Sequence, residues 1–479
     1  MKKFSLISIL LLAAASQAMA KVSLPPIFSD NMVIQQQTEA AVWGWTKPGR
    51  KVVITPSWSG KGTSVVAGKD GKFLTRISTP AAGGPYTISF NDGENVTISN
   101  VLAGEVWLAS GQSNMEMKLG GNAAQPVEGT DALLLKANPE TPIRIFKVGR
   151  QPALKPMETF KGKWGLNTAE DIFSSSAIAY MFAKEIQETV GVPVGILETD
   201  WGGSNIEAWM NPELLRKEFP DVSLEAIDSG VLPENGRVQR KCPGVIYCGQ
   251  LYPVMPYTFK GMLWYQGESN RSNPAQYVEL QKAFVKMLRD EFQNPDAPFY
   301  FVQIAPYAYD GKDKFASGYF YEAQEKAWKE TPGCGMVTTG DVGEERLIHP
   351  RRKAQVAHRL ACYALTRQYG RKVVTPEPPT YKSVEFDGGK AKVSLNCDRF
   401  GVNPSGPEVG GFEISGADKV FHHAKAKVIE SGKKILVWNK DVKEPVAVRY
   451  CFRNWSVATV FNQWGQPLAP FRTDNWDEL

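Results

Sequence analysis

The chain has 479 residues, a formal net charge of +5 and a hydrophobic fraction of 43%. This length is sufficient for two or three domains, and the hydrophobic fraction is that of a globular protein with a buried core. The small positive excess, with no block of like charges, gives no reason to expect a nucleic-acid or membrane-surface partner. The composition leaves the oligomeric state open.

Residues 1–20 have the pattern of a secretory signal peptide. Lys2 and Lys3 precede an apolar run over Phe4–Ala15, and Ala18-Met19-Ala20 resembles a cleavage site. The apolar run is shorter than the roughly 18 residues that a membrane span needs. With no cysteine at the cleavage site, no membrane anchor is expected, and we predict a protein that is exported to the periplasm or secreted.

Six cysteines in an exported chain are typical of disulfide bonds. The sequence does not fix their connectivity, and a free buried thiol is an alternative for Cys362, which lies in a helical pattern. The pairings that we predict are Cys242 with Cys248, Cys334 with Cys362, and Cys397 with Cys451.

Residues 21–103 contain short strand patterns separated by Gly and Pro at intervals of about ten residues. Alternation of this kind predicts an N-terminal β-sandwich-like domain, and it contains no catalytic cluster. The runs that carry the pattern are 41–45, 51–54, 86–90 and 95–98.

From residue 104 to about 372 strand patterns alternate with helical patterns. The strand patterns are 106–110, 194–199, 261–265, 298–304 and 335–339, and the helical ones are 175–189, 275–292, 319–329 and 351–368. Such alternation predicts an α/β domain with a mainly parallel sheet and helices on both faces. In that architecture a ligand binds at the carboxyl ends of the strands.

Thr375-Pro-Glu-Pro-Pro379 has the composition of a stiff linker. After it, residues 380–479 contain β-rich runs at 391–395, 434–438 and 446–450, which predict a second all-β domain. We expect the two β domains to brace the central one, with glycan binding as the alternative.

Polar motifs follow three of the predicted strands, where the fold would place a site. They are Gly111-Gln-Ser-Asn114, Asp200-Trp-Gly-Gly-Ser-Asn205 and Gln266-Gly-Glu-Ser-Asn270, and a fourth motif, Ile348-His-Pro350, precedes the last predicted helix. A serine at the turn after a strand is a common way to present a nucleophile in α/β folds. With only four histidines in the chain, few residues could act as its base.

Together these motifs resemble the SGNH (GDSL-like) hydrolase superfamily and, within it, the sialate O-acetylesterase family. The similarity includes the nucleophile block around Ser113, the glycine block Trp201-Gly-Gly203, the third block Trp264–Asn270 and the histidine block around His349. The opening Leu24–Met32 and the closing Pro470–Asp474 also look like that family, so that the resemblance covers nearly the whole mature chain.

The resemblance implies a three-layer α/β catalytic domain and a serine esterase that needs no cofactor and no metal. Ser113 would attack an acetyl carbonyl while His349 takes its proton and returns it to the leaving sugar hydroxyl. The backbone N–H groups of Ser113 and Gly202 would form the oxyanion hole, completed by the side-chain amide of Gln266 or Asn270.

The chain departs from the superfamily at one important position. An aspartate usually stands three residues before the histidine and orients the imidazole, but here that residue is Arg346. The expectation is therefore a Ser–His dyad without a standard third member. Asp341, Glu344, Glu345 or a backbone carbonyl remain open as the group that orients the ring.

Candidates for substrate binding surround these motifs. Trp201 and Trp209 have flat rings suited to sugar faces, whereas Trp264 and Tyr265 are as well explained as core residues. Gln112 lies in the nucleophile block, and Arg271 and Arg346 are candidates for pairing with the carboxylate of a sialic acid. The expected partner is an acetylated carbohydrate, a sialoglycan or a plant polysaccharide.

Three rival functions remain at this stage. An acetylxylan or acetylmannan esterase would use the same chemistry on another sugar. A zinc-dependent deacetylase would need clustered ligands, and the spacing of His349 and His358 fits no usual zinc pattern. A non-catalytic carbohydrate-binding protein would explain the aromatic residues but not the four ordered motifs.

Overall fold

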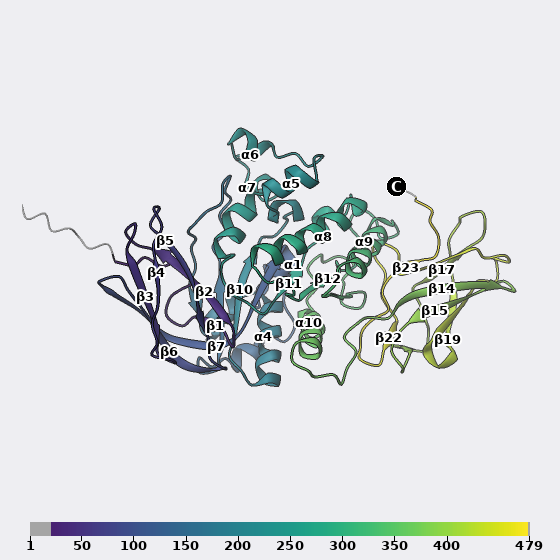
Figure 1. The fold of residues 1–479 in the computed structure, drawn as a ribbon. Coiled ribbons are helices and arrows are strands. Elements are labelled where there is room, and N and C mark those ends of the chain that lie inside the picture. The colour runs from purple at the N-terminus through teal and green to yellow at the C-terminus, as the bar shows by residue number, and fades with distance from the viewer. Residues whose placement is uncertain (1–20, 478–479) are drawn as a thin grey trace, which may run out of the picture.

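The structure is a computed structural model, and it describes residues 21–477. A β-rich unit, a central α/β unit and a second β-rich unit follow one another along the molecule (Figure 1). The predicted signal peptide lies outside the described residues. No helix within the described range is long and apolar enough to cross a membrane.

The N-terminal unit consists of two antiparallel sheets. One pairs β2 (Glu39–Trp45) with β5 (Lys72–Ser78), and the other contains β4 (Thr63–Val66), β3 (Lys51–Pro56), β6 (Gly83–Asn91) and the first half of β7 (Asn95–Gly111). Buried side chains of both sheets, such as Val42, Phe73, Ile54 and Phe90, belong to one core. The structure thus confirms an antiparallel β unit here.

Strand β7 continues from this unit into the central sheet without a break. Its first half pairs with β6, and from Glu105 onward it pairs with two strands of the central sheet. The short strand β1 (Val33–Gln35) pairs in parallel with residues 102–104 at the crossing point. Since one strand belongs to both units, no flexible linker separates them.

The central sheet is parallel in all but one of its neighbouring pairs. Its order is β13 (Cys334–Val337), β12 (Phe299–Val302), β11 (Gly261–Tyr265), β7, β10 (Val194–Asp200), β8 (Ile143–Lys147) and the antiparallel edge β9 (Trp164–Gly165). The five strands predicted from the sequence are confirmed. Strand β8 was missed because Arg144 and Lys147 obscure its apolar pattern, although Arg144 is buried and donates to the carbonyl of Asn31.

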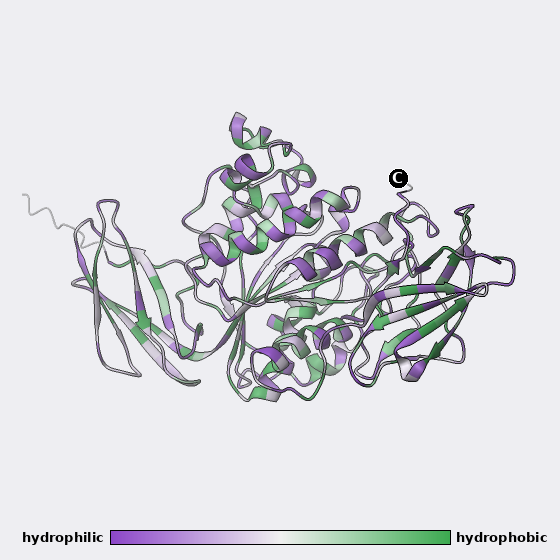
Figure 2. Cartoon of the chain, turned by 45° about the vertical axis from the view of Figure 1, so that its right-hand side comes forward, coloured by the Kyte–Doolittle hydropathy of each residue, from purple (hydrophilic) through white to green (hydrophobic). Residues whose placement is uncertain are grey.

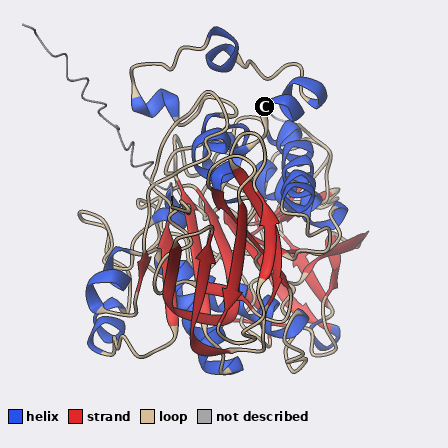
Figure 3. Ribbon diagram, turned by 60° about the vertical axis from the view of Figure 1, so that its left-hand side comes forward, coloured by secondary structure: helices blue, strands red, loops and turns tan. Residues whose placement is uncertain are grey.

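Alternate residues of these strands pack against opposite helix layers. Trp107, Leu263 and Tyr300 lie in a core with α4 (Ala177–Val190) and α10 (Lys353–Arg367). Leu108, Met262 and Phe301 lie in the other core with α8 (Pro274–Glu291) and α9 (Ala316–Glu330). Figures 1 and 3 show the sheet between the two layers, and Figure 2 shows the apolar side of the helices turned toward it.

Smaller elements form the connections around the sheet. They are α1 (Ser113–Glu116), α2 (Thr130–Leu135), α3 (Ala169–Ser174), η1 (Ile206–Trp209), α5 (Pro212–Glu218), α6 (Glu225–Ser229), α7 (Gly236–Gln239), η2 (Tyr247–Leu251), η3 (Tyr252–Val254) and η4 (Glu268–Asn270). A cleft of about 670 Å³ lies between β2, β5 and the η2–η3 segment. None of the predicted catalytic residues lines it.

The C-terminal unit has its own core and three small antiparallel sheets. They contain β14 (Thr380–Asp387), β15 (Lys390–Asn396), β20 (Lys434–Trp438) and β19 (Lys425–Ile429); β18 (His422–His423), β17 (Phe412–Ser415), β21 (Ala447–Tyr450) and β23 (Phe471–Arg472); and β16 (Val402–Pro404) with β22 (Val460–Asn462). The 3₁₀ turn η5 (Glu430–Gly432) precedes β20.

The buried Asn454 joins this unit to the central one. Its backbone carbonyl accepts from the N–H of Tyr307, and its Oδ1 accepts from the N–H of Ser317 and from Arg271. Three hydrogen bonds to one buried residue hold the two units in a fixed relation.

The predicted disulfides are not present, and all six cysteines, which lie within the described range, are free. Three of the thiols contact groups other than the predicted partner cysteine. Cys362 Sγ faces His358, Cys397 Sγ faces the carbonyl of Gly432, and Cys451 Sγ accepts from Ser456. The alternative of a free thiol at Cys362 agrees with the structure.

Candidate active site

The three polar motifs begin at the same edge of the sheet because their strands end in register. Gly111, the last residue of β7, is paired with Asp200 at the end of β10 and with Tyr265 at the end of β11. The N–H of Trp201 donates to the carbonyl of Gly111, and the N–H of Gln112 donates to the carbonyl of Tyr265. Parallel pairing thus brings together motifs that are far apart in the chain, as the hydrogen bond between Gln112 and Gly267, 155 residues later, illustrates.

The turn that presents Ser113 depends on the glycine before it. Gly111 has φ of +144°, and a Cβ built on it would collide with the carbonyl of Tyr265. This close approach lets the chain leave the strand and start α1 at Ser113. The Ser113 hydroxyl makes no hydrogen bond to any residue of 21–477, and its backbone N–H is one of the free donors of a helix N-terminus.

His349 is held by a side chain that sequence reasoning missed. Its Nδ1 lies 2.8 Å from Oε1 of Gln125. Because an amide oxygen only accepts hydrogen bonds, Nδ1 carries the proton, and Nε2 is left as the basic nitrogen. Burial first, and then the nearby charge of Lys353, lower the pKa of His349 to about 4, while Glu116 acts in the opposite direction.

The acids proposed as third members have other partners. Asp341 forms an ion pair with Arg359, and Glu344 is bound to the backbone and the guanidinium of Arg351. Among residues 21–477, Glu345 forms a hydrogen bond through its backbone carbonyl alone, which accepts from the N–H of Ala308. The group that lies next to Nδ1 of His349 in this structure is a neutral amide, not a carboxylate or a backbone carbonyl.

A buried polar network ties the nucleophile block to the histidine block. Asn114, fully buried, donates to Oε1 of Glu268 (2.7 Å) and to the carbonyl of Ile348 (3.1 Å), and its Oδ1 accepts from Lys353 Nζ (2.6 Å). Burial raises the pKa of Glu268 and lowers that of Lys353 to about 7. The residue after Ser113 is thus bonded to the residue before His349, which fixes the spacing of the two loops.

Gly202 lies beside the nucleophile, but its N–H is already used. A Cβ built on Gly202 would lie 3.2 Å from Cβ of Ser113. The Gly202 N–H donates to Oε2 of Glu116, and Arg150 holds this carboxylate through Nη2 at 2.7 Å. The predicted oxyanion donor therefore faces a side-chain carboxylate in this structure.

The remaining polar candidates mainly support the loops. Gln112, predicted to bind substrate, has its Oε1 occupied by the N–H groups of Gly267 and Ser269. Gln266 is fully buried, and its Nε2 donates to the carbonyl of Ser204 and to Asn270 Oδ1, which leaves no donor for an oxyanion. Nδ2 of Asn270 donates to Glu207 and keeps a second hydrogen.

The aromatic and arginine candidates differ in their burial and in their partners. Trp209, predicted as a sugar platform, is fully buried in this structure and donates to Oγ of Ser204. Trp201 is half-buried at the edge of the core. Arg271 packs on the ring of Tyr309 at 3.7 Å and donates to Asn454, whereas Arg346 is exposed. Trp264 and Tyr265 are core residues.

Arg240 is a cation at the site that sequence reasoning missed. A Cβ built on Gly203 would lie 2.9 Å from Cζ and Nη2 of Arg240. The Arg240 side chain has no hydrogen-bond or ion-pair partner among residues 21–477, and its Nε is buried. Arg240 comes from the long segment between β10 and β11, where no motif marks it. Gln125, in a loop after α1, was equally unmarked, while Glu116 and Lys353 flank the recognised motifs.

A serine at the end of a central parallel strand, with a histidine loop tied to it, is typical of serine esterases with a three-layer α/β fold. Comparisons with known proteins make this more specific. A family model for carbohydrate esterases described as sialic acid-specific acetylesterase matches residues 103–365, and the chain belongs to this family.

Relatives of known activity and structure agree with the assignment. The sialate O-acetylesterase of Homo sapiens is 26% identical over 411 residues, covering 77% of this chain and 75% of that protein. The sialate O-acetylesterase of Mus musculus is 25% identical and covers 89% of each chain. The crystal structure of a carbohydrate acetylesterase from Xanthomonas citri has a TM-score of 0.84 and 33% identity, and covers 95% of this chain and all of that one.

Proposed function

We propose that this protein is a carbohydrate O-acetylesterase that uses Ser113 as its nucleophile. The observation that carries the proposal is the position of Ser113 at the end of β7, beside Gly202 and in a loop bonded to the one that carries His349. Membership of a carbohydrate esterase family supports the same chemistry. Hydrogen bonds of catalytic groups are often long in free enzymes and shorten when substrate binds, so a free Ser113 hydroxyl agrees with this role.

In the proposed mechanism, Ser113 Oγ attacks the acetyl carbonyl and His349 Nε2 takes the hydroxyl proton. The oxyanion is bound by the N–H of Ser113 and by the N–H of Gly202, from which the incoming oxygen displaces Glu116. Collapse of the intermediate breaks the bond to the sugar oxygen, which receives the proton from His349. Water then attacks the acetyl-enzyme in the same way and releases acetate. The second hydrogen of Asn270 Nδ2 is the remaining amide candidate.

We propose sialic acid esters as the preferred substrates. The argument is Arg240, a guanidinium without an acidic partner that packs on Gly203, one residue from Gly202. A guanidinium binds a carboxylate with two parallel hydrogen bonds, and sialic acids carry such a carboxylate whereas xylan and mannan do not. Arg271, the earlier candidate, is occupied by Tyr309 and Asn454.

The alternative within the same chemistry is an acetylxylan or acetylmannan esterase. The similarity to the Xanthomonas citri structure, which is described as a carbohydrate acetylesterase without a named sugar, agrees with either substrate. Membership of an esterase family speaks against the other alternative, a non-catalytic carbohydrate-binding protein.

The deciding experiment measures acetate release from O-acetylated sialoglycan and from acetylated xylan. The wild-type protein is compared with Ser113→Ala, Arg240→Gln and the control Arg346→Gln, which changes an exposed arginine. We expect sialoglycan to be the better substrate, Ser113→Ala to be inactive on both, and Arg240→Gln to lose its preference for sialoglycan.

Each outcome has a distinct meaning. Activity of Ser113→Ala equal to wild type would overturn the proposed nucleophile. If the wild type preferred xylan and Arg240→Gln showed the same preference, the esterase chemistry would stand, but the proposal that sialic acid esters are the preferred substrates would be overturned. If Arg346→Gln lost the preference for sialoglycan and Arg240→Gln kept it, Arg346 and not Arg240 would be the residue that binds the carboxylate.

We also propose export to the periplasm or secretion, on the pattern of residues 1–20, and three domains over 21–103, 104–372 and 380–479. Asn454 of the C-terminal unit, hydrogen-bonded to Arg271 and Ser317 of the central unit, supports a bracing role for the last domain. N-terminal sequencing of the protein recovered outside the cytoplasm tests the export signal, with cleavage expected after Ala20.

A further inference from the structure

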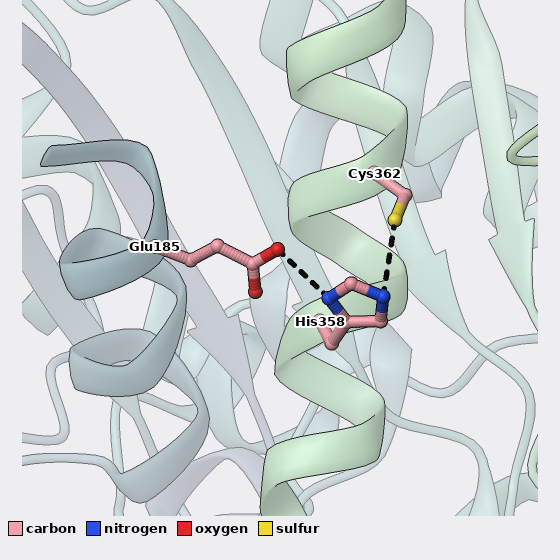
Figure 4. A group of neighbouring side chains, drawn as sticks. All are labelled: Glu185, His358 and Cys362. Carbon is pink, nitrogen blue, oxygen red and sulfur yellow. Dashed lines mark hydrogen bonds and ion pairs between the residues drawn. The ribbon is translucent and has the colours of Figure 1, made fainter. Parts of the chain in front are cut away.

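Three side chains that can bind metals gather on the outer side of the α4–α10 helix layer, away from Ser113. His358 and Cys362 lie one turn apart on α10, and Glu185 faces them from α4 (Figure 4). Their ligand atoms all lie within 4.8 Å of one another. The side chain of His358 is 57% exposed and that of Glu185 is 28% exposed, so solvent and ions can reach the cluster.

The two ring nitrogens of His358 have different partners. Nε2 lies 3.5 Å from Sγ of Cys362, and Nδ1 lies 2.8 Å from Oε1 of Glu185. A tetrahedral zinc ion with bonds of about 2.3 Å to sulfur and about 2.05 Å to nitrogen holds these two atoms roughly 3.5 Å apart. The spacing of Sγ and Nε2 thus matches a chelate without movement of the helix.

The position of Glu185 matches the second layer of a metal site. Metal-bound histidines usually donate their other N–H to a carboxylate, which fixes the tautomer and makes the ligand more basic.

We propose that His358 Nε2 and Cys362 Sγ bind a thiophilic divalent cation such as Zn²⁺, with Glu185 orienting the imidazole through Nδ1. On binding, the thiol proton, and the Nε2 proton where the ring carries one, pass to solvent as the metal–sulfur and metal–nitrogen bonds form. Water completes the coordination. No electron transfer is involved.

The site would act on stability, since it connects two elements of the catalytic domain. The bound ion would fix His358 on α10, and His358 is hydrogen-bonded to Glu185 on α4. Helix α10 begins at Lys353, which donates a hydrogen bond to Asn114. A ligand that binds only the folded state stabilises it in proportion to its occupancy. The proposed ester hydrolysis uses no metal. A metal site here does not conflict with this, because none of these three residues belongs to the proposed active site.

The test uses the full mature protein, first stripped with a chelator, and Co²⁺ as a spectroscopic probe with Zn²⁺ as competitor. We expect one Co²⁺ per chain with thiolate-to-metal charge-transfer absorption, displaced by Zn²⁺, and a rise in the melting temperature with either ion. The variants are His358→Gln and Cys362→Ser, with Cys242→Ser as the matched control for a partly exposed thiol outside the cluster.

We expect His358→Gln and Cys362→Ser to lose the absorption and the thermal shift, and Cys242→Ser to keep both. Glu185→Gln should weaken binding about ten-fold or more. Acetate release by the stripped wild-type enzyme at a temperature well below melting should be unchanged. Absence of the charge-transfer band in wild type, or its persistence in His358→Gln, would overturn the site, and an unchanged affinity in Glu185→Gln would overturn the orienting role. Melting curves of the metal-free variants identify any that fail to fold, and His358→Gln, at an exposed position, then carries the test.

Discussion

Nδ1 of His349 is hydrogen-bonded to the side-chain amide oxygen of Gln125 at 2.8 Å. In the familiar serine–histidine–aspartate arrangement a carboxylate occupies this position and stabilises the imidazolium that forms during the reaction. An amide orients the ring and fixes its tautomer but supplies no full negative charge. Burial and then the nearby charge of Lys353 lower the pKa of His349 to about 4, so that the ring is neutral over the physiological range.

Replacing Gln125 with glutamate should move the acid limb of the pH profile upward. For the wild type we expect kcat/KM to fall only as the pH drops through about 4, where His349 becomes protonated. A carboxylate next to the ring favours the imidazolium and should raise that pKa by about 1–3 units, so that activity is lost at a higher pH. The measurement is kcat/KM against pH for both proteins.

Gln125→Leu is the matched control for this change. It removes the acceptor without adding charge, so kcat should fall while the acid limb does not move upward. If Gln125→Glu kept the wild-type limb, His349 would not be the group that limits activity in acid.

Replacing Lys353 with methionine should lower kcat with little change in KM. Lys353 is fully buried and donates to Asn114 Oδ1, so it acts by positioning the two loops and does not touch the substrate. A displacement of the order of 1 Å in a reacting group can cost about 100-fold in rate. Steady-state kinetics on one acetyl ester separate the two constants, and a rise in KM alone would contradict the positioning role.

The same variant should also change the pH dependence of stability. The pKa of Lys353 is lowered to about 7 in the folded state, below its usual value of 10.5. Between these pH values the unfolded chain holds a proton that the folded chain lacks, so the free energy of unfolding rises with pH from about 7 to 10.5. Lys353→Met lacks this contribution. Denaturant unfolding of both proteins at pH 7 and pH 9 measures the difference in slope.

Trp209 and Trp201 should respond differently to substitution. Trp209→Ala removes a fully buried ring and should lower the free energy of unfolding by about 3–5 kcal/mol. Trp201→Ala, at a half-buried position beside Gly202, should be milder for folding and should raise KM. Trp209→Phe, which keeps most of the packing, provides a folded variant in which KM should stay at the wild-type value; a raised KM there would return Trp209 to the substrate site.

All six cysteines should titrate as free thiols. Denatured protein, kept without reductant, should react with six equivalents of a thiol reagent, and a reducing agent should leave the melting temperature unchanged. Four equivalents or fewer would indicate a disulfide. Peptide mapping would then tell whether Cys362 takes part, which is incompatible with its proposed metal bond.

The strands of the central sheet could be predicted because their apolar runs are long and end in small or polar residues. Gly261–Tyr265 is found with the bounds that the sequence predicts, since five consecutive apolar or aromatic positions fit a strand that is buried on both faces. Strand β8 could not be predicted in this way, because the buried Arg144 interrupts its apolar run. Arg144 donates hydrogen bonds to the carbonyls of Asn31 and Asn100, which are far away in the chain.

The order of elements, the α/β class of the central unit and the four motifs could be predicted, because they depend on periodicity and local composition. The partners of the polar side chains near Ser113 could not, since they depend on the three-dimensional arrangement. Gln125 and Arg240 are brought to the site by segments with no local pattern, and Glu116, at the end of α1, accepts a hydrogen bond from the N–H of Gly202 across the fold. Gln266 and Trp209 are taken out of it by partners across the fold. Hydrogen bonds and burial are properties of neighbours in space, and those neighbours are fixed only when the strands pair.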